Sequence, residues 1–152
     1  MSESAAFPKM YRVRQSFDAP TISDVASEVE RQLSSLMLDT RLRPGQTVAI
    51  TAGSRGIANI ATIIKGIVDH CRKLGATPFI VPAMGSHGGG TPEGQCEILH
   101  GYGITPEAMG CEIRASMETV IVAETPQGIP VHFDKHASTA DHVIVCGRVK
   151  PH

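Results

Sequence analysis

The sequence predicts an α/β domain with an open, mainly parallel sheet, flanking helices and a β-rich second half. Two short apolar runs rich in β-branched residues, 47–51 and 77–81, are typical of buried strands. Between them, residues 60–74 carry apolar side chains at helical spacing. A strand, a helix and a strand within about 35 residues form a βαβ unit, so we expect the two strands to be parallel with a right-handed crossover.

The N-terminal quarter predicts a tail, a strand and a helix. We expect the first eight residues (1–8) to be flexible and residues 9–152 to form a single domain. Residues 11–17 alternate between the two faces of a strand, with Tyr11, Val13 and Gln15 on one side. Pro20 and Ser23 then predict a helix with Ser23 as its N-cap. Its apolar stripe consists of Val25, Val29, Leu33, Leu36 and Met37.

The later elements follow from turn residues and apolar runs. Gly75 is placed for a left-handed C-terminal cap of the helix before it. Thr91 is a suitable N-cap for a helix that begins with proline and ends near His100 and Gly101. Beyond it, strand-like runs are expected at 111–114, 119–123 and 131–133, with a turn at Gln127-Gly128, and a last apolar strand is expected at 142–147.

Composition excludes several classes of function. The 152 residues contain 14 Lys and Arg against 15 Asp and Glu, which leaves no concentrated basic surface for nucleic acid. No stretch approaches the ~20 apolar residues that cross a membrane, and the N-terminus does not resemble a signal peptide. The four cysteines form no C-x-x-C pair. We therefore expect reduced thiols in a cytoplasmic protein that binds neither nucleic acid nor membrane.

Three polar loops follow predicted strands, at 52–56, 85–90 and 148–152. Ligands of open α/β sheets bind beyond the carboxyl ends of the strands, so these loops are expected to converge on one site. We expect Arg55 to lie at the start of a helix, where free N–H groups and a guanidinium together favour an anion. The alternative for Arg55 is an exposed side chain with a surface partner.

His87 stands among small residues, in Gly85-Ser86-His87-Gly88-Gly89-Gly90. Its imidazole suits a general acid or base, or a metal ligand, although a lone loop histidine is more often a polar surface residue. His70 and His100 are expected on helix surfaces. Ser54 and Ser86 could act as nucleophiles only beside a placed base. The P-loop, the dinucleotide fingerprint and the G-x-S-x-G elbow are all absent.

Four motifs stand out together: Gly53-Ser54-Arg55-Gly56-Ile57, Gly85-Ser86-His87 with Thr91 and Glu93, Tyr102-Gly103-Ile104, and Arg148-Val149-Lys150-Pro151-His152. This set resembles the N-terminal domain of the lactate racemase family, which is the nickel-pincer-nucleotide racemase and epimerase superfamily. The similarity runs from about residue 48 to His152. The resemblance implies two α/β domains with the site between them, of which this chain would be the first.

The resemblance also implies a chemistry. Members racemise or epimerise the carbon that bears a 2-hydroxy group, by hydride abstraction and return through a nickel-carrying pyridinium mononucleotide. His87 and His152 match the two acid/base histidines, and Arg55 matches the arginine that binds the substrate carboxylate. Ser54, Gly85 and Thr91 are expected to bind the cofactor. A base at the hydroxyl and a fixed carboxylate are what such a transfer needs.

The chain departs from the family at three places. Characterised lactate racemases resemble Asp-x-Thr-Arg at the first loop, where this chain has Ala52, and they often carry Arg where it has Gly88. These differences favour a 2-hydroxy acid other than lactate. The family's cofactor-attaching lysine and nickel-binding histidine lie downstream of the second histidine. We therefore expect a missing C-terminal domain, a protein partner that is either a separate C-terminal half or a second copy of this chain, and no turnover by this chain alone.

Two other functions remain open from the residues. The chain could be a stand-alone module in which Arg55 and the glycine-rich loops hold a small carboxylate or phosphate without catalysis. It could also be a mononuclear metal-binding protein that uses His87 and His152, although no set of metal ligands is assigned. The ligand is expected to be a small molecule both for the racemase-like domain and for the anion-binding module.

Overall fold

A three-stranded parallel sheet forms the centre of the protein. In a computed structural model, which describes residues 8–149, the strand order is β2-β1-β5. The strands are β1 (Thr47–Ala52), β2 (Thr77–Pro82) and β5 (His142–Ile144). Both neighbouring pairs are parallel, and Ile50 stands between Ile80 and Ile144. The predicted βαβ unit and the α/β class are confirmed.

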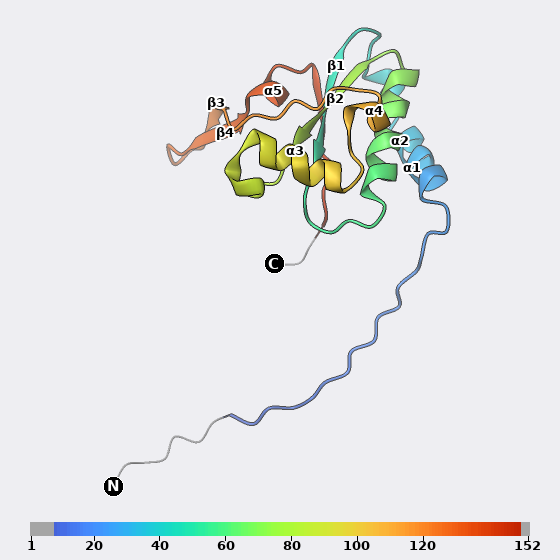
Figure 1. The fold of residues 1–152 in the computed structure, drawn as a ribbon, viewed down its shortest axis with the longest axis vertical. Helices are drawn as coiled ribbons and strands as arrows, with labels where there is room; N and C mark the ends of the chain where they lie inside the picture. The colour runs from blue at the N-terminus through green and yellow to red at the C-terminus, as the bar shows by residue number, and fades with distance from the viewer. Residues whose placement is uncertain (1–7, 150–152) are drawn as a thin grey trace.

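Helices flank the sheet, and a separate hairpin projects from it (Figure 1). The main helices are α1 (Val25–Ser35), α2 (Ile60–Lys73) and α3 (Pro92–Gly101). Short helical turns are η1 (Leu38–Thr40), η2 (Gly88–Gly90), α4 (Pro106–Met109) and α5 (Lys135–Ser138). The antiparallel hairpin consists of β3 (Thr119–Glu124) and β4 (Pro130–Asp134), as expected for a β-rich second half.

Alternate residues of the strands build two hydrophobic clusters on the two faces of the sheet. Val48, Ile50 and Ile80 belong to the larger cluster, which also contains buried residues of α1, α2, α3 and α4. Ala49 and Phe79 belong to the smaller cluster, which α5 covers through Ala137. Continuous burial of β1 and β2 explains why both read as unbroken apolar runs in the sequence.

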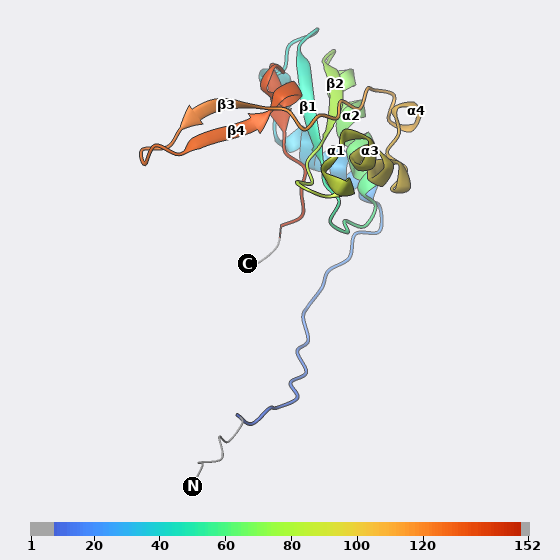
Figure 2. The ribbon, with the colours of Figure 1, turned by 60° about the vertical axis from the view of Figure 1, so that its left-hand side comes forward.

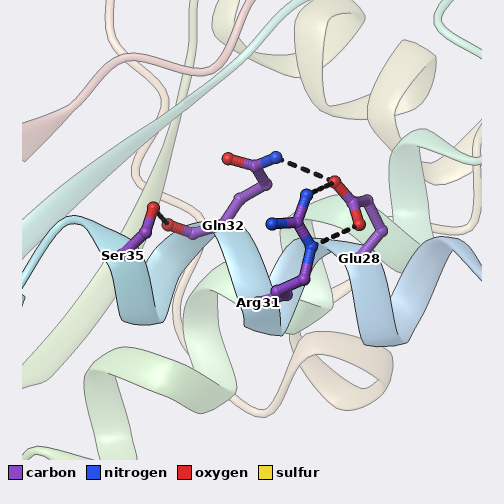
Figure 3. Close-up of polar contacts among 4 residues, drawn as sticks. All are labelled: Glu28, Arg31, Gln32 and Ser35. Atoms are coloured by element: carbon purple, nitrogen blue, oxygen red, sulfur yellow. Dashed lines mark hydrogen bonds and ion pairs between the residues drawn. The ribbon is translucent and has the colours of Figure 1, made fainter.

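Asp24, and not Ser23, is the N-cap of α1. The Asp24 carboxylate accepts a hydrogen bond from the Ser27 amide at 3.1 Å, so the predicted cap is wrong by one residue. An ionised carboxylate satisfies a free N–H and also faces the positive end of the helix dipole. On the exposed side of α1, Arg31 and Gln32 both donate to the Glu28 carboxylate (Figure 3).

Two further predictions in this region are wrong. Residues 11–17 form no strand, because no neighbouring strand pairs with them in the described chain. Tyr11, Val13 and Phe17 are exposed. Figure 2 shows the segment leading away from the domain. His70 is not a surface residue but is buried, with its Nδ1 3.3 Å from Glu30 Oε2. It is covered because α1 packs along α2.

The last predicted strands are shorter than expected. Only Ile113 of the run 111–114 makes a bridge, parallel to Ile80 at the outer edge of β2. Within the run 142–147 the strand ends at Ile144. Beyond it, the backbone of Cys146 forms hydrogen bonds with the side-chain hydroxyl of Thr51. This hydroxyl accepts from the Cys146 amide at 2.9 Å and lies 3.2 Å from the Cys146 carbonyl oxygen, to which it donates.

Three smaller expectations are also tested by residues 8–149. Gly75 has the predicted left-handed conformation, with φ of +80°. All four cysteines are free, and burial raises the pKa of the Cys71 thiol to about 11. None of the described helices combines the length and apolar character that a membrane crossing requires.

Candidate functional site

A cavity of about 510 Å³ opens at the carboxyl edge of the sheet. Loops that follow β1, β2 and β5 line it together, so the expected convergence of three loops is confirmed. The arrangement follows from parallel strands, whose carboxyl ends meet at one edge. The lining residues are Thr51, Gly53, Ser54, Arg55, Ile57, Ala83, Met84, Gly85, His87, Val145, Cys146, Gly147 and Arg148.

His87 and Ser54 meet in this cavity. The Ser54 Oγ lies 2.7 Å from the His87 Nδ1, in a partly buried hydrogen bond between residues 33 positions apart. Ser54 follows β1 and His87 follows β2, so the contact bridges the two neighbouring loops. The His87 Nε2 makes no hydrogen bond to any residue in 8–149, and it is the nitrogen left to exchange a proton.

The backbone of Ser54 is held from the other side by Tyr102. The Tyr102 hydroxyl donates to the Ser54 carbonyl oxygen at 2.9 Å. Tyr102 directly follows α3, whose preceding loop carries His87. One tyrosine therefore ties the loop after β1 to the segment after α3.

Two contacts with α3 fix the loop that carries His87. The buried Gln95 amide donates to the Gly85 carbonyl oxygen at 2.8 Å. Gly88, with φ of +66°, lies against Gly94 so closely that a Cβ on Gly88 would lie 2.6 Å from the Gln95 nitrogen. The group that approaches Gly88 closely is therefore the backbone of α3.

Two arginines supply the charge of the cavity. Arg55 and Arg148 both line it, and no lining residue is acidic. An Arg148 guanidinium nitrogen lies 3.6 Å from where a Cβ on Gly56 would be, which places it over the residue next to Arg55. Neither arginine forms an ion pair with an acidic residue of the described chain. Two uncompensated guanidinium groups at one opening attract an anion.

Only some of the predicted site residues lie in the cavity. Ser54, Arg55, Gly85 and His87 line the cavity. The expected place of Arg55 at a helix start is wrong, because α2 begins only at Ile60 and Arg55 lies in the loop before it. The Thr91 hydroxyl caps α3, accepting from the Gly94 amide at 3.1 Å, and Thr91 does not line the cavity. His152 lies outside the described residues.

The sequence did not single out Gln95, because its role depends on a contact across a loop and its type gives no signal. Cys146 was also missed as a lining residue; burial raises the pKa of its thiol. Tyr102 and Arg148 appeared only as parts of the family motifs. Their positions relative to Ser54 and Arg55 become visible only in the fold.

Residues 8–149 contain no group of three or more His, Cys, Asp or Glu side chains that could hold a metal ion. The cavity itself brings one imidazole and one thiol, from His87 and Cys146. These residues do not fit as the binding set for nickel.

Comparison with known proteins identifies the relationship. No curated protein matches the chain. A family model described as the lactate racemase N-terminal domain matches residues 7–152, which is nearly the whole chain and includes every loop of the cavity. The chain therefore belongs to the lactate racemase N-terminal domain family.

Proposed function

We propose that this protein binds a 2-hydroxy acid in the cavity and acts in the inversion of its C2 carbon, as a racemase or epimerase. The observation that carries the proposal is the convergence of His87 and Arg55 on one cavity, in a chain that belongs to the lactate racemase family. An imidazole and a guanidinium at one opening match the hydroxyl and the carboxylate of such a substrate.

The substrate carboxylate is assigned to Arg55, with Arg148 beside it. A guanidinium grips a carboxylate through two parallel N–H···O hydrogen bonds, which fixes its orientation as well as its position. Because no acidic residue lines the cavity, no protein carboxylate there competes for these donors. Fixing the carboxylate also fixes C2, which is one bond away.

His87 is assigned to the substrate hydroxyl. Inversion through a 2-oxo acid requires the hydroxyl oxygen to lose a proton while C2 loses a hydride; both then return, the hydride to the opposite face. His87 would accept the proton in one direction and give it back in the other. His152 matches the second acid/base histidine of the family. The resemblance implies that a nickel-pincer nucleotide supplies the hydride acceptor.

A second candidate function rests on the same arginines. Arg55 and Arg148 without an acidic neighbour would also serve a module that binds a small carboxylate or phosphate and catalyses nothing. This alternative gives the Ser54–His87 hydrogen bond no purpose, and for that reason we place it second.

The experiment that tests the proposal follows single enantiomers of several 2-hydroxy acids, incubated in D2O with the protein, a separately expressed C-terminal half of the family and a nickel-pincer nucleotide. Chiral chromatography should show conversion to the other enantiomer, and mass spectrometry should show that C2 keeps its original hydrogen. Incorporation of deuterium at C2 would contradict hydride transfer. Tight anion binding without any interconversion would favour the second candidate.

A further inference from the structure

We propose that Ser54 is the positioning residue of His87, and that it does so by accepting a hydrogen bond from the imidazole Nδ1–H. Ser54 was expected to bind a cofactor, but the structure places its hydroxyl 2.7 Å from the His87 Nδ1. The catalytic meaning of this contact rests on the proposed function, whereas the contact itself does not.

The direction of the hydrogen bond follows from what His87 has to do. A serine hydroxyl can donate to an unprotonated Nδ1 or accept from a protonated one. If it donates, the neutral ring carries its proton at Nε2 and has no lone pair there to accept another. If it accepts, the neutral ring is protonated at Nδ1, and the Nε2 lone pair is free for the substrate proton. Only the second arrangement makes His87 a base at Nε2.

A hydroxyl also differs from the carboxylate that often orients a catalytic histidine. A carboxylate favours the imidazolium through its negative charge. A hydroxyl that accepts from the Nδ1–H orients the ring without adding charge. No acidic residue lines the cavity, and among residues 8–149 Ser54 is the only side chain that forms a hydrogen bond with the His87 ring. Ser54 is therefore the side chain in the cavity that can orient this imidazole.

Both partners of the contact are held in place by other groups. The Tyr102 hydroxyl donates to the Ser54 carbonyl oxygen, and Ser54 lies two residues beyond the end of the buried strand β1. The His87 amide donates to the Met84 carbonyl oxygen at 3.2 Å, and Gln95 holds the same loop at Gly85. A side chain whose own backbone is anchored can fix the rotamer and tautomer of another.

The test uses the imidazole nitrogens of His87, observed by long-range ¹H–¹⁵N NMR on the ¹⁵N-labelled protein at a pH where the ring is neutral. Ser54→Ala removes the acceptor, and Ser54→Thr restores a hydroxyl. Ser86→Ala is the control, because Ser86 is exposed on the same loop and forms no hydrogen bond to a described residue. Each ¹H–¹⁵N amide spectrum reports whether the variant is folded.

We expect the neutral wild-type ring to be protonated at Nδ1, which is the minor form of free histidine. Ser54→Ala should shift it toward the Nε2-protonated form, and Ser54→Thr and Ser86→Ala should keep the wild-type form. An Nε2-protonated wild-type ring, or a ring that Ser54→Ala leaves unchanged, would overturn the proposal. Failure of the proposed function would show separately, as absent inversion of 2-hydroxy acids with the Nδ1-protonated ring intact.

Discussion

Gly88 and Gly94 lie in direct backbone contact, which presses the residue after His87 against the first turn of α3. A Cβ on Gly94 would lie 2.8 Å from the Gly88 carbonyl carbon, with the carbonyl oxygen closer still. Gly88 also has φ of +66°, a conformation that favours glycine. The pair sets where the His87 loop stands relative to α3, and α3 in turn leads to Tyr102.

Substitution of Gly94 by Ala should therefore destabilise the protein and displace the His87 loop. The new methyl group overlaps backbone atoms, which cannot rotate away as a flexible side chain would. Overpacking of this kind costs about 1–3 kcal/mol. Urea unfolding would measure the loss of stability, and the amide shifts of residues 85–88 would report the displacement.

Gly101→Ala provides the matched control, since Gly101 ends the same helix and a Cβ there would meet nothing within 4 Å. We expect it to be neutral or to stabilise the protein by up to about 1 kcal/mol. Equal stability of the Gly94→Ala and Gly101→Ala variants would show that the backbone contact is looser than described.

Gln95→Ala should loosen the same loop by a different route. It removes the amide that donates to the Gly85 carbonyl oxygen, and the loss of a buried hydrogen bond costs about 1–3 kcal/mol. Thermal unfolding and the amide shift of Gly85 would measure the effect. Glu97→Ala, at an exposed position of the same helix, should change neither. A Gln95→Ala variant as stable as Glu97→Ala would show that Gln95 does not stabilise the loop that carries His87.

Tyr102→Phe should weaken the hold on Ser54. The change deletes one hydroxyl, whose hydrogen bond to the Ser54 carbonyl oxygen contributes about 0.5–1.5 kcal/mol. Hydrogen exchange at the amides of residues 53–56 should accelerate. Tyr11→Phe is the natural control, because Tyr11 is exposed and outside any element. Unchanged exchange in Tyr102→Phe would contradict an anchoring role.

How far the sequence predicts this protein depends on the kind of contact involved. β1 and β2 were predictable because both are largely buried and form apolar runs, and α2 because its buried residues recur at helical spacing. The strand prediction for residues 11–17 was wrong because alternation of side chains permits a strand, whereas a strand also needs a neighbouring strand to pair with. The Ser54–His87 contact joins two loops far apart in the sequence, and the Gly88–Gly94 contact joins a loop to the first turn of α3. The sequence could name these residues but not their partners.

Acid should remove the contribution of Glu28 to stability. The hydrogen bonds from the Arg31 side chain, followed by that from Gln32, lower the Glu28 pKa from 4.5 to about 2 (Figure 3). A carboxyl with a lowered folded-state pKa stabilises the fold above its ordinary pKa, and it loses this effect as pH falls from 4.5 through about 2. Because the pair is exposed, the effect is small.

Urea midpoints of the wild type and Glu28→Gln, measured between pH 7 and pH 3, would test this prediction. The difference between the two proteins should be constant above pH 5 and should shrink toward pH 3. Glu97→Gln is the control, since its carboxylate forms no ion pair with the residues that the structure describes. A difference for Glu28→Gln that does not change with pH would contradict the assignment.

Arg55 carries the central claim, because the assignment of the cavity to a 2-hydroxy acid requires a bound carboxylate. The most direct measurement is an NMR titration of the protein with a 2-hydroxy acid, compared with Arg55→Gln. Arg43→Gln is the control, because Arg43 precedes β1 and lies at the opposite end of that strand. The account predicts shifts at Ser54, Arg55 and His87 in the wild type and in Arg43→Gln, and at least a tenfold weaker affinity in Arg55→Gln, a loss of about 1.4 kcal/mol. Equal affinity of all three proteins, or shifts confined to residues outside the cavity, would contradict it.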